Sequence, residues 1–283
     1  MSRGVVAVIY KKIVIFVAML DVEILIPTVD NLGRVAHMSL PRLEGVRYVV
    51  RCQGAHGDVP ESLRREDVSL MWGEDRGLSV NRNVLLSASS ATIVMFIDDD
   101  IELRPEALYK VLNYLDADPE LDYVAFNCRS NSHDTGSERC LDLCDGKMRY
   151  FTMYSMVIRR RAIDTIRFSV LAGVGAPFLK SGEDDLFYYQ MVSRGLRGVY
   201  LPVTATAHPG ESTGDRRQTP GVLRGRGGVL HMVYPCTSLL HIIYVAARVK
   251  GLGFFKNIKY MLQGRRYAIR YHRELLFLDA FDG

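Results

Sequence analysis

Residues 91–103, ATIVMFIDDDIEL, are the segment from which the fold can be predicted. The first seven (91–97) are apolar and rich in β-branched side chains, a pattern typical of a strand buried on both faces of an α/β sheet. The strand runs directly into Asp98, Asp99 and Asp100. Ligands of open α/β sheets bind beyond the carboxyl ends of the strands, and hard divalent cations prefer oxygen ligands. Two interpretations stay open at this point: a metal–diphosphate site, or a solvated acidic turn that precedes the next helix.

The other apolar segments alternate between strand and helix patterns. Such alternation predicts an α/β fold in which a Rossmann-like, mostly parallel central sheet is flanked by helices. We expect one main domain at residues 1–215 and a C-terminal helical, basic-aromatic extension at residues 216–283. The expected strands are 22–26, 47–52, 68–72, 91–97, 121–126, 152–158 and 197–203, and the expected helices are 78–90, 104–115 and 181–194.

Charge is distributed unevenly along the chain. The 283 residues carry a net charge of +4, but residues 201–283 hold 12 Lys and Arg against 5 Asp and Glu. Between Arg248 and Arg273 there are eight basic residues and no acidic one, interleaved with aromatic side chains. This mixture predicts contact of residues 227–273 with an anionic membrane surface, and a solvated helix face is the alternative. No nucleic-acid-binding module accompanies it, so no nucleic-acid partner is expected.

Two apolar segments bear on membrane association. Residues 4–20 are interrupted by Lys11 and Lys12, so no uncharged run reaches the ~20 residues of a membrane span; an N-terminal anchor stays open as an alternative. Residues 227–247 carry no Asp, Glu, Lys or Arg but include Pro235, which favours a helix packed on the domain or lying in the membrane interface.

The five cysteines are scattered, and no convincing secretory signal precedes them. We expect reduced thiols in a cytoplasmic protein that is peripheral on the inner face of the membrane. Cys140 and Cys144 lack a second ligand pair nearby, which argues against a zinc site.

Several motifs follow one another in a fixed order: IPT (26–28), GLSVNRN (77–83), FIDDD (96–100), SGEDDLF (181–187) and His208. In this order the chain resembles the family 2 inverting nucleotide-sugar glycosyltransferases of GT-A fold. The matches span residues 22–208, about two thirds of the chain. The resemblance implies a GT-A-type catalytic domain with a DXD motif.

The resemblance also implies a donor site on the amino-terminal half. The implied donor-binding residues are Pro27, Thr28, Asp30, Gln53, Arg82, Asp98 and Asp99. A guanidinium such as that of Arg82 matches phosphate and carboxylate oxygens bidentately. An Asx-type turn is the alternative for Asp30, and a helix-surface ion pair is the alternative for Arg82. Asp99 is also the aspartate whose side chain can point back into supporting structure.

The implied metal ligands are Asp100, Asp98 and His208, with Mn²⁺ or Mg²⁺ as the ion that suits an oxygen-rich site. A divalent ion that bridges two phosphates stabilises a nucleoside diphosphate leaving group without proton transfer. The alternative for His208 is an incidental histidine after a strand.

Asp184 is the expected general base, with Glu183 and Asp185 as further candidates. Inversion in a single displacement needs a carboxylate that takes the proton of the attacking hydroxyl. Ser181 and Asp184 also have the spacing of a helix capping box, which is the competing interpretation.

The resemblance implies transfer of one sugar from a nucleotide-diphosphate sugar, which we expect to be UDP-linked, to a hydroxyl of a growing glycan or lipid-linked saccharide. The chain shows no multi-span region and no QxxRW-type segment, which argues against a processive polymer synthase. The polar segment 127–149 matches no family motif and is expected to help shape the acceptor pocket.

Two other functions fit the sequence less well. A sugar-nucleotide pyrophosphorylase would show a Gly-rich, Arg-containing loop after the first strand, and TVDNLGR (28–34) is a poor match. A non-catalytic, membrane-associated binding protein of the same fold is disfavoured by the intact set of acidic residues.

Overall fold

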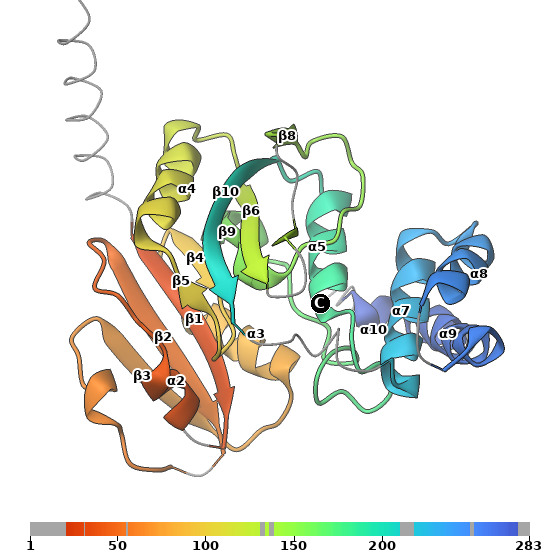
Figure 1. Cartoon of the computed structure of the whole chain (residues 1–283), viewed down its shortest axis with the longest axis horizontal. Helices are drawn as coiled ribbons and strands as arrows, with labels where there is room; N and C mark the ends of the chain where they lie inside the picture. The colour runs from red at the N-terminus through yellow and green to blue at the C-terminus, as the bar shows by residue number, and fades with distance from the viewer. Residues whose placement is uncertain are drawn as a thin grey trace, which may run out of the picture.

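The computed structural model describes residues 21–30, 32–54, 56–130, 134–135, 139–209, 218–249 and 252–276. Figure 1 shows a twisted central sheet with helices on both faces and a separate group of helices, drawn in blue, beyond one end of it. The apolar segment 4–20 and part of the polar segment 127–149 lie outside the described residues.

Within the described part of the chain, ten strands form one sheet in the order β3-β2-β1-β4-β9-β6-β10-β5, with β7 beside β6 and β8 beside β10. Strands β3, β2, β1 and β4 are parallel, as are β6 and β10. Strand β9 runs antiparallel to both of its neighbours, β4 and β6. The strands are β1 (Val22–Val29), β2 (Val46–Gln53), β3 (Val68–Gly73), β4 (Ile93–Phe96), β5 (Glu102–Leu103), β6 (Tyr123–Ser130), β7 (Asp134–Thr135), β8 (Leu141–Asp142), β9 (Met156–Arg159) and β10 (Gly198–His208).

The strand order creates a switch point between β1 and β4. The chain passes from β1 outward to β2 and β3 and then returns to the other side of β1 as β4. The two strands are parallel with Leu25 opposite Phe96, so they end side by side. Such a switch point is where open α/β sheets leave a crevice for ligands.

Helices cover both faces of the sheet because successive strand residues point to opposite sides. Ile24 and Ile26 of β1 share a buried cluster with residues of α4, whereas Leu25 shares one with residues of α3 and α5. The α-helices are α2 (Gly33–His37), α3 (Leu78–Ala88), α4 (Pro105–Ala117), α5 (Glu183–Ser193), α7 (Pro220–Val233), α8 (Ser238–Arg248), α9 (Phe254–Arg270) and α10 (His272–Leu275), and the 3₁₀ turns are η1 (Glu61–Leu63), η2 (Met153–Ser155) and η3 (Arg160–Ile163).

The predicted α/β fold class is confirmed, and the predicted elements need three corrections. The segment 152–158 begins as the 3₁₀ turn η2, and only its end pairs as β9. The last strand is longer than predicted, so that His208 is its final residue instead of lying in the loop beyond it. The polar segment contains the two-residue strand β8, which pairs with β10.

The C-terminal helices pack on one another and on α5. Leu186 of α5 shares a buried cluster with Val229 of α7 and Ala268 of α9. Helices α7 and α9 approach at Gly227 and Gly264, where a side chain on either glycine would overlap the backbone of the other helix. No helix in the described ranges combines the length and apolar character needed to cross a membrane.

We predict that Gly264→Ala destabilises the protein. A methyl group at Gly264 would overlap the carbonyl oxygen of Arg224 on α7, and overpacking of this kind costs about 1–3 kcal/mol, more than the ~1 kcal/mol of helix propensity that alanine adds. The melting temperature should fall by several degrees. Gly57→Ala is the matched control, because a methyl group there meets no atom within 4 Å. An unchanged or higher melting temperature for Gly264→Ala would contradict the close approach.

Candidate functional site

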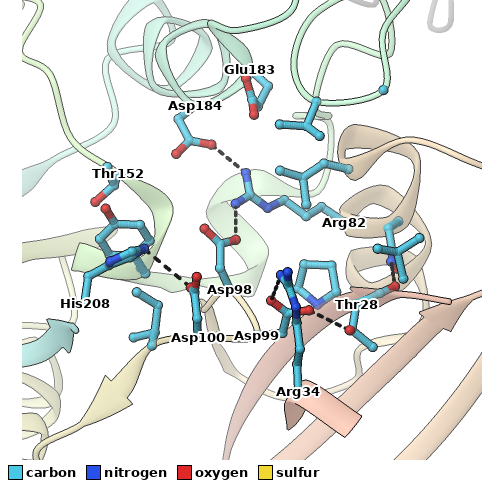
Figure 2. Close-up of a pocket in the computed structure, with 18 of the residues that line it drawn as sticks. Thr28, Arg34, Arg82, Asp98, Asp99, Asp100, Thr152, Glu183, Asp184 and His208 are labelled. Carbon is cyan, nitrogen blue, oxygen red and sulfur yellow. Dashed lines mark hydrogen bonds and ion pairs between the residues drawn. The ribbon is translucent and has the colours of Figure 1, made fainter. Parts of the chain in front are cut away.

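One pocket opens at the carboxyl ends of β1 and β4, opposite the first turn of α5. It receives side chains from segments that are far apart in the sequence (Figure 2). The predicted site residues that line it are Pro27, Thr28, Gln53, Arg82, Asp98, Asp99, Asp100, Glu183, Asp184, Asp185 and His208.

Arg82 of α3 forms the centre of the pocket wall. One terminal nitrogen donates to Oδ1 of Asp184 at 2.6 Å, and the other donates to Oδ1 of Asp98 at 2.8 Å (Figure 2). The Arg82 side chain is only 2% exposed, so the helix-surface ion pair considered from the sequence is wrong. Burial by itself lowers the pKa of Arg82, but the charges of Asp184 and Asp98 more than offset this and raise it. A charged guanidinium therefore joins the strand-end aspartates to the acidic turn of α5.

The rest of GLSVNRN holds α3 in place. The Ser79 hydroxyl donates to the carbonyl of Ala172 at 2.9 Å. The Asn81 amide donates to the carbonyls of Thr28 and Arg51, at 3.1 and 3.2 Å, at the ends of β1 and β2. These bonds anchor the helix to the loop and to the strand ends that frame the pocket.

Asn83 adds a reciprocal pair of hydrogen bonds. Its amide donates to the Phe168 carbonyl at 2.8 Å, and the Phe168 backbone N–H donates back at 2.8 Å. The Phe168 ring lies 5.2 Å from the Arg82 guanidinium carbon, a cation–π distance. The polar residues of the motif therefore fix the position of Arg82 as well as contributing it.

Asp184 is held by two donors. In addition to Arg82, the backbone N–H of Met153 donates to Oδ2 of Asp184 at 3.2 Å. The predicted capping box is not observed: Gly182 is the N-cap residue, and the Ser181 hydroxyl donates to the Val222 carbonyl of α7. Burial raises the pKa of Asp184, while the Arg82 charge opposes the rise. The Asp184 carboxylate therefore faces the pocket and does not cap the N-terminus of α5.

Glu183 and Asp185 flank Asp184 and have different surroundings. Burial and the charge of Asp184 raise the pKa of Glu183 to about 7, with Arg82 opposing. The same two causes raise the pKa of Asp185 to about 7, with Arg226 of α7 opposing. Three carboxyl groups in one helical turn thus compete for ionisation, and Asp184 is the one that has a bonded cation.

Asp99 points to the β1 side of the pocket. Its Oδ2 accepts the hydroxyl of Thr28 at 2.6 Å, and Arg34 of α2 lies 3.4 Å from its Oδ1 (Figure 2). This matches the expectation that one of the three aspartates serves supporting structure, while Thr28 and Asp99 both still line the pocket.

Asp100 and His208 meet on the other side. His208 Nε2 lies 3.5 Å from Asp100 Oδ1, because β10 ends next to the turn after β4 (Figure 2). The third predicted metal ligand, Asp98, is bonded to Arg82 instead. Among the described residues, no three His, Cys, Asp or Glu side chains converge closely enough to hold an ion. The Asp100 carboxylate is the ligand type that Mg²⁺ and Mn²⁺ prefer, and His208 beside it would supply a second protein ligand.

Gln53 and Asp30 lie at the end of the pocket nearest β2. The Gln53 amide donates to Asp75 at 2.6 Å and to the Gly77 carbonyl at 3.2 Å. Asp30 has a positive φ of 67° and accepts from Arg76 at 2.7 Å. It is not among the residues that line the pocket, but its backbone N–H donates to the Gln53 carbonyl at 2.7 Å. Asp30 therefore lies directly beside Gln53 and Arg76, which do line the pocket.

Comparison with known proteins finds one family model that matches part of the chain. The model of "Glycosyl transferase family 2" matches residues 61–179, which include Arg82 and the three aspartates. The match covers less than half of the chain, and it makes residues 61–179 similar to glycosyl transferase family 2. No curated protein matches it significantly.

Solved structures agree on the GT-A fold. S. aureus TarS residues 1–349 in complex with UDP aligns with a TM-score of 0.54 and 16% identity, covering 90% of this chain and 73% of that one. The same protein in complex with UDP-GlcNAc gives a TM-score of 0.52 and 15% identity, covering 90% and 74%. The longer TarS structure gives a TM-score of 0.52 and 15% identity, covering 82% of this chain, which spans only 44% of the TarS chain.

Part of the pocket wall is formed by residues that the sequence did not predict. Two arginines, Arg34 and Arg76, line the pocket near Thr28 and Gln53. Neither belongs to a sequence motif that would have indicated a role in the site. A row of residues directly after the polar segment lines the opposite wall: Tyr150, Phe151, Thr152 and Tyr154. The aromatic content of that row was the available signal.

We predict that Glu183→Gln flattens the dependence of stability on pH. The pKa of Glu183 is raised from 4.5 to about 7 in the folded protein, so the folded state binds more protons than the unfolded state between these values. The stabilising contribution is complete below pH 4.5 and is lost as the pH rises through 7. Chemical denaturation gives the free energy of unfolding at pH 5 and at pH 8. The decrease between these two pH values should be smaller in Glu183→Gln than in wild type by about 1–2 kcal/mol. The exposed Glu66 provides the control Glu66→Gln, and an equal effect of both variants would refute the assignment.

Proposed function

We propose that this chain is a metal-dependent, inverting glycosyltransferase that moves one sugar from a UDP-linked donor to a hydroxyl acceptor. The observation that carries the proposal is the bridge formed by Arg82. It places the acidic turn of α5 and the aspartates after β4 in one pocket, within 2.6 and 2.8 Å of the same guanidinium. Group transfer from a nucleotide sugar needs these two functions side by side: a site for the diphosphate and a carboxylate for the acceptor hydroxyl.

The donor is assigned to the side of the pocket formed by β1 and β2. Thr28 and Gln53 line this side, and Arg34 and Arg76 add positive charge near the strand ends. A nucleoside diphosphate carries negative charge along its length, and guanidinium groups bind phosphate oxygens bidentately. TarS, which shares the fold, has been crystallised with UDP and with UDP-GlcNAc, and this supports UDP as the nucleotide part.

Asp100 and His208 would hold the divalent ion. When bound, Mn²⁺ or Mg²⁺ supplies positive charge that stabilises the departing diphosphate. Burial raises the pKa of Asp100, and the proximity of His208 opposes the rise. Asp98, which Arg82 holds in place, would contact the donor. Asp99 would fix the position of the Thr28 hydroxyl.

Asp184 is the proposed general base. The acceptor oxygen attacks the anomeric carbon as its proton passes to the carboxylate, and the bond from that carbon to the diphosphate oxygen breaks. Arg82 and the Met153 N–H fix the orientation of the carboxylate, which leaves an oxygen lone pair for the hydroxyl. Attack opposite to the leaving group in one displacement inverts the anomeric configuration.

The acceptor is assigned to the wall formed by Tyr150, Phe151, Thr152 and Tyr154. This segment lies beside Asp184, since the backbone N–H of Met153 donates to the Asp184 carboxylate at 3.2 Å. Aromatic side chains offer apolar surface with a polar tip, which suits the faces and hydroxyls of a saccharide. We propose a growing glycan or lipid-linked saccharide as acceptor, in polysaccharide biosynthesis at the inner face of the membrane.

We predict that Mn²⁺ increases the thermal stabilisation of the protein by UDP, because a ligand that binds only the folded state raises its stability. In Asp100→Asn the Mn²⁺-dependent increment should disappear. Asp99→Asn is the matched control, since asparagine retains an acceptor for the Thr28 hydroxyl and the increment should persist. Differential scanning fluorimetry with UDP, other nucleoside diphosphates and their sugars, with and without Mn²⁺, measures this directly. Loss of the increment in both variants, or in neither, would contradict the assignment of Asp100.

We predict that Asp184→Asn lowers kcat for sugar transfer by about 10²–10⁴-fold, the usual contribution of general base catalysis, while UDP still binds with affinity within about twofold of wild type. Asp185→Asn is the comparison, since Asp185 is the same residue type in the next position and interacts with Arg226 instead of Arg82. Product formation followed by chromatography gives kcat, and calorimetry gives the UDP affinity. Equal losses of kcat in the two variants would contradict the assignment of Asp184 as the general base. An absence of transfer and hydrolysis with every donor in wild type would favour the non-catalytic binding protein.

A further inference from the structure

Helix α8 presents an apolar face away from the rest of the protein. Leu240 is 69% exposed, and Leu239, Ile243 and Tyr244 are each about half exposed. These positions recur with helical spacing, so they form one stripe along the helix. The opposite face, represented by Ile242, is buried against α7 and α9. The exposed stripe is therefore not required to pack α8 onto the protein.

The first turn of α9 extends this apolar surface. The Asn257 amide donates to the carbonyls of Ala246 and Val249, at 3.1 and 3.0 Å, which holds the start of α9 against the last turn of α8. Phe254 and Phe255 lie in that first turn, and Phe255 is 83% exposed. We call the surface formed by Leu239, Leu240, Ile243, Tyr244, Phe254 and Phe255 the α8–α9 face.

Basic side chains adjoin the α8–α9 face. The Arg248 guanidinium carbon lies 3.9 Å from the centre of the Tyr244 ring. Lys256 and Lys259 are exposed on α9 directly after Phe255, and Arg266 and Arg270 are exposed further along the same helix. The sequence has no Asp or Glu between Arg248 and Arg273, so no acidic side chain of this segment neutralises these charges.

We propose that the α8–α9 face binds the surface of an anionic lipid bilayer. Leucine, isoleucine and phenylalanine side chains would enter the boundary between headgroups and acyl chains, as in interfacial amphipathic helices. The flanking lysines and arginines would lie at the level of the negatively charged headgroups. Tyr244 and Arg248 are of the types that occupy the interface itself, with an apolar body and a polar end.

Two other occupants fit this face less well than a bilayer. A second copy of the chain docked through the same face would bring basic residues of the two copies together, and like charges across an interface oppose association. Nucleic acid would match the charge, and single-stranded binders stack bases on aromatic side chains, but half of this face is formed by Leu239, Leu240 and Ile243, which offer bases neither a ring nor a hydrogen bond. An anionic bilayer satisfies both the apolar and the basic part.

This inference does not depend on the proposed transferase activity, because no residue of the α8–α9 face lines the pocket. If the transferase assignment holds, the same contact would hold the enzyme at a surface that carries lipid-linked acceptors.

Vesicle co-sedimentation of the full chain tests the proposal. We expect wild type to bind vesicles of phosphatidylcholine with roughly one quarter phosphatidylglycerol at least tenfold more tightly than vesicles of phosphatidylcholine alone. The double variant Leu240→Asp/Phe255→Asp should lose roughly tenfold or more of this affinity. The control Tyr114→Asp/Val170→Asp changes two other exposed apolar side chains, outside the C-terminal helices, and should bind within twofold of wild type.

A second arm tests the charge. Lys256→Gln/Lys259→Gln should weaken binding to the anionic vesicles severalfold, whereas Lys110→Gln/Lys147→Gln, two exposed lysines of the main domain, should not. Equal melting temperatures and equal UDP-induced stabilisation would show that all variants are folded.

Three results would overturn the proposal: wild type that binds neither vesicle or both equally, an aspartate double variant that binds as wild type does, or wild type that is dimeric and fails to bind vesicles while the variant is monomeric. Failure of sugar transfer with intact vesicle binding would count against the proposed function alone.

Discussion

The guanidinium of Arg82 is buried and charged, and its neutralisation constrains the rest of the site. A buried charge without a partner costs several kcal/mol, and removal of one partner from a buried ion pair typically costs about 3–5 kcal/mol. Arg82 meets this requirement with carboxylates from two other elements, Asp98 after β4 and Asp184 in α5. Three segments separated by up to 102 positions in the sequence are thereby held in one arrangement. The pairing also keeps Asp184 near a cation, which favours its ionised form while the neighbouring Glu183 and Asp185 are driven toward protonation.

The sheet topology decides which residues can reach this cluster. Because β1 and β4 are parallel neighbours at the switch point, Thr28 and the aspartates end at the same edge. Strand β10 brings His208 to that edge from the other half of the sheet, through its pairing with β6 and β5. Each aspartate then contacts a different partner: Asp98 the arginine, Asp99 the β1 threonine and Asp100 the histidine. Three adjacent identical side chains thus acquire three different environments.

The C-terminal helices combine two properties that are usually separate. Their inner faces pack closely, with glycines at the α7–α9 crossing and direct contact with α5, the helix that carries the acidic turn. Their outer face exposes large apolar side chains next to basic ones. Since α7 also supplies Arg226 near Asp185, the helical extension influences the acidic turn electrostatically as well as packing behind it.

The sequence by itself was sufficient for the α/β class, the placement of most strands and helices, and part of the set of residues that line the pocket. These predictions succeed because periodic apolar patterns and strand-end carboxylates depend on local chemistry. The family assignment likewise rested on the order of short motifs, and the family comparison supports it.

The sequence also suggested a capping box at Ser181 and a surface ion pair for Arg82, and both were wrong, since Ser181 bonds to α7 and Arg82 is buried. Only the tertiary structure decided these points, together with the division of the three aspartates, the pairing of Asp30 with Arg76 and the aromatic wall at 150–154. Each of these features depends on which distant segment lies opposite a given side chain. Strand order and helix packing determine that neighbour, whereas the residues adjacent in the sequence do not.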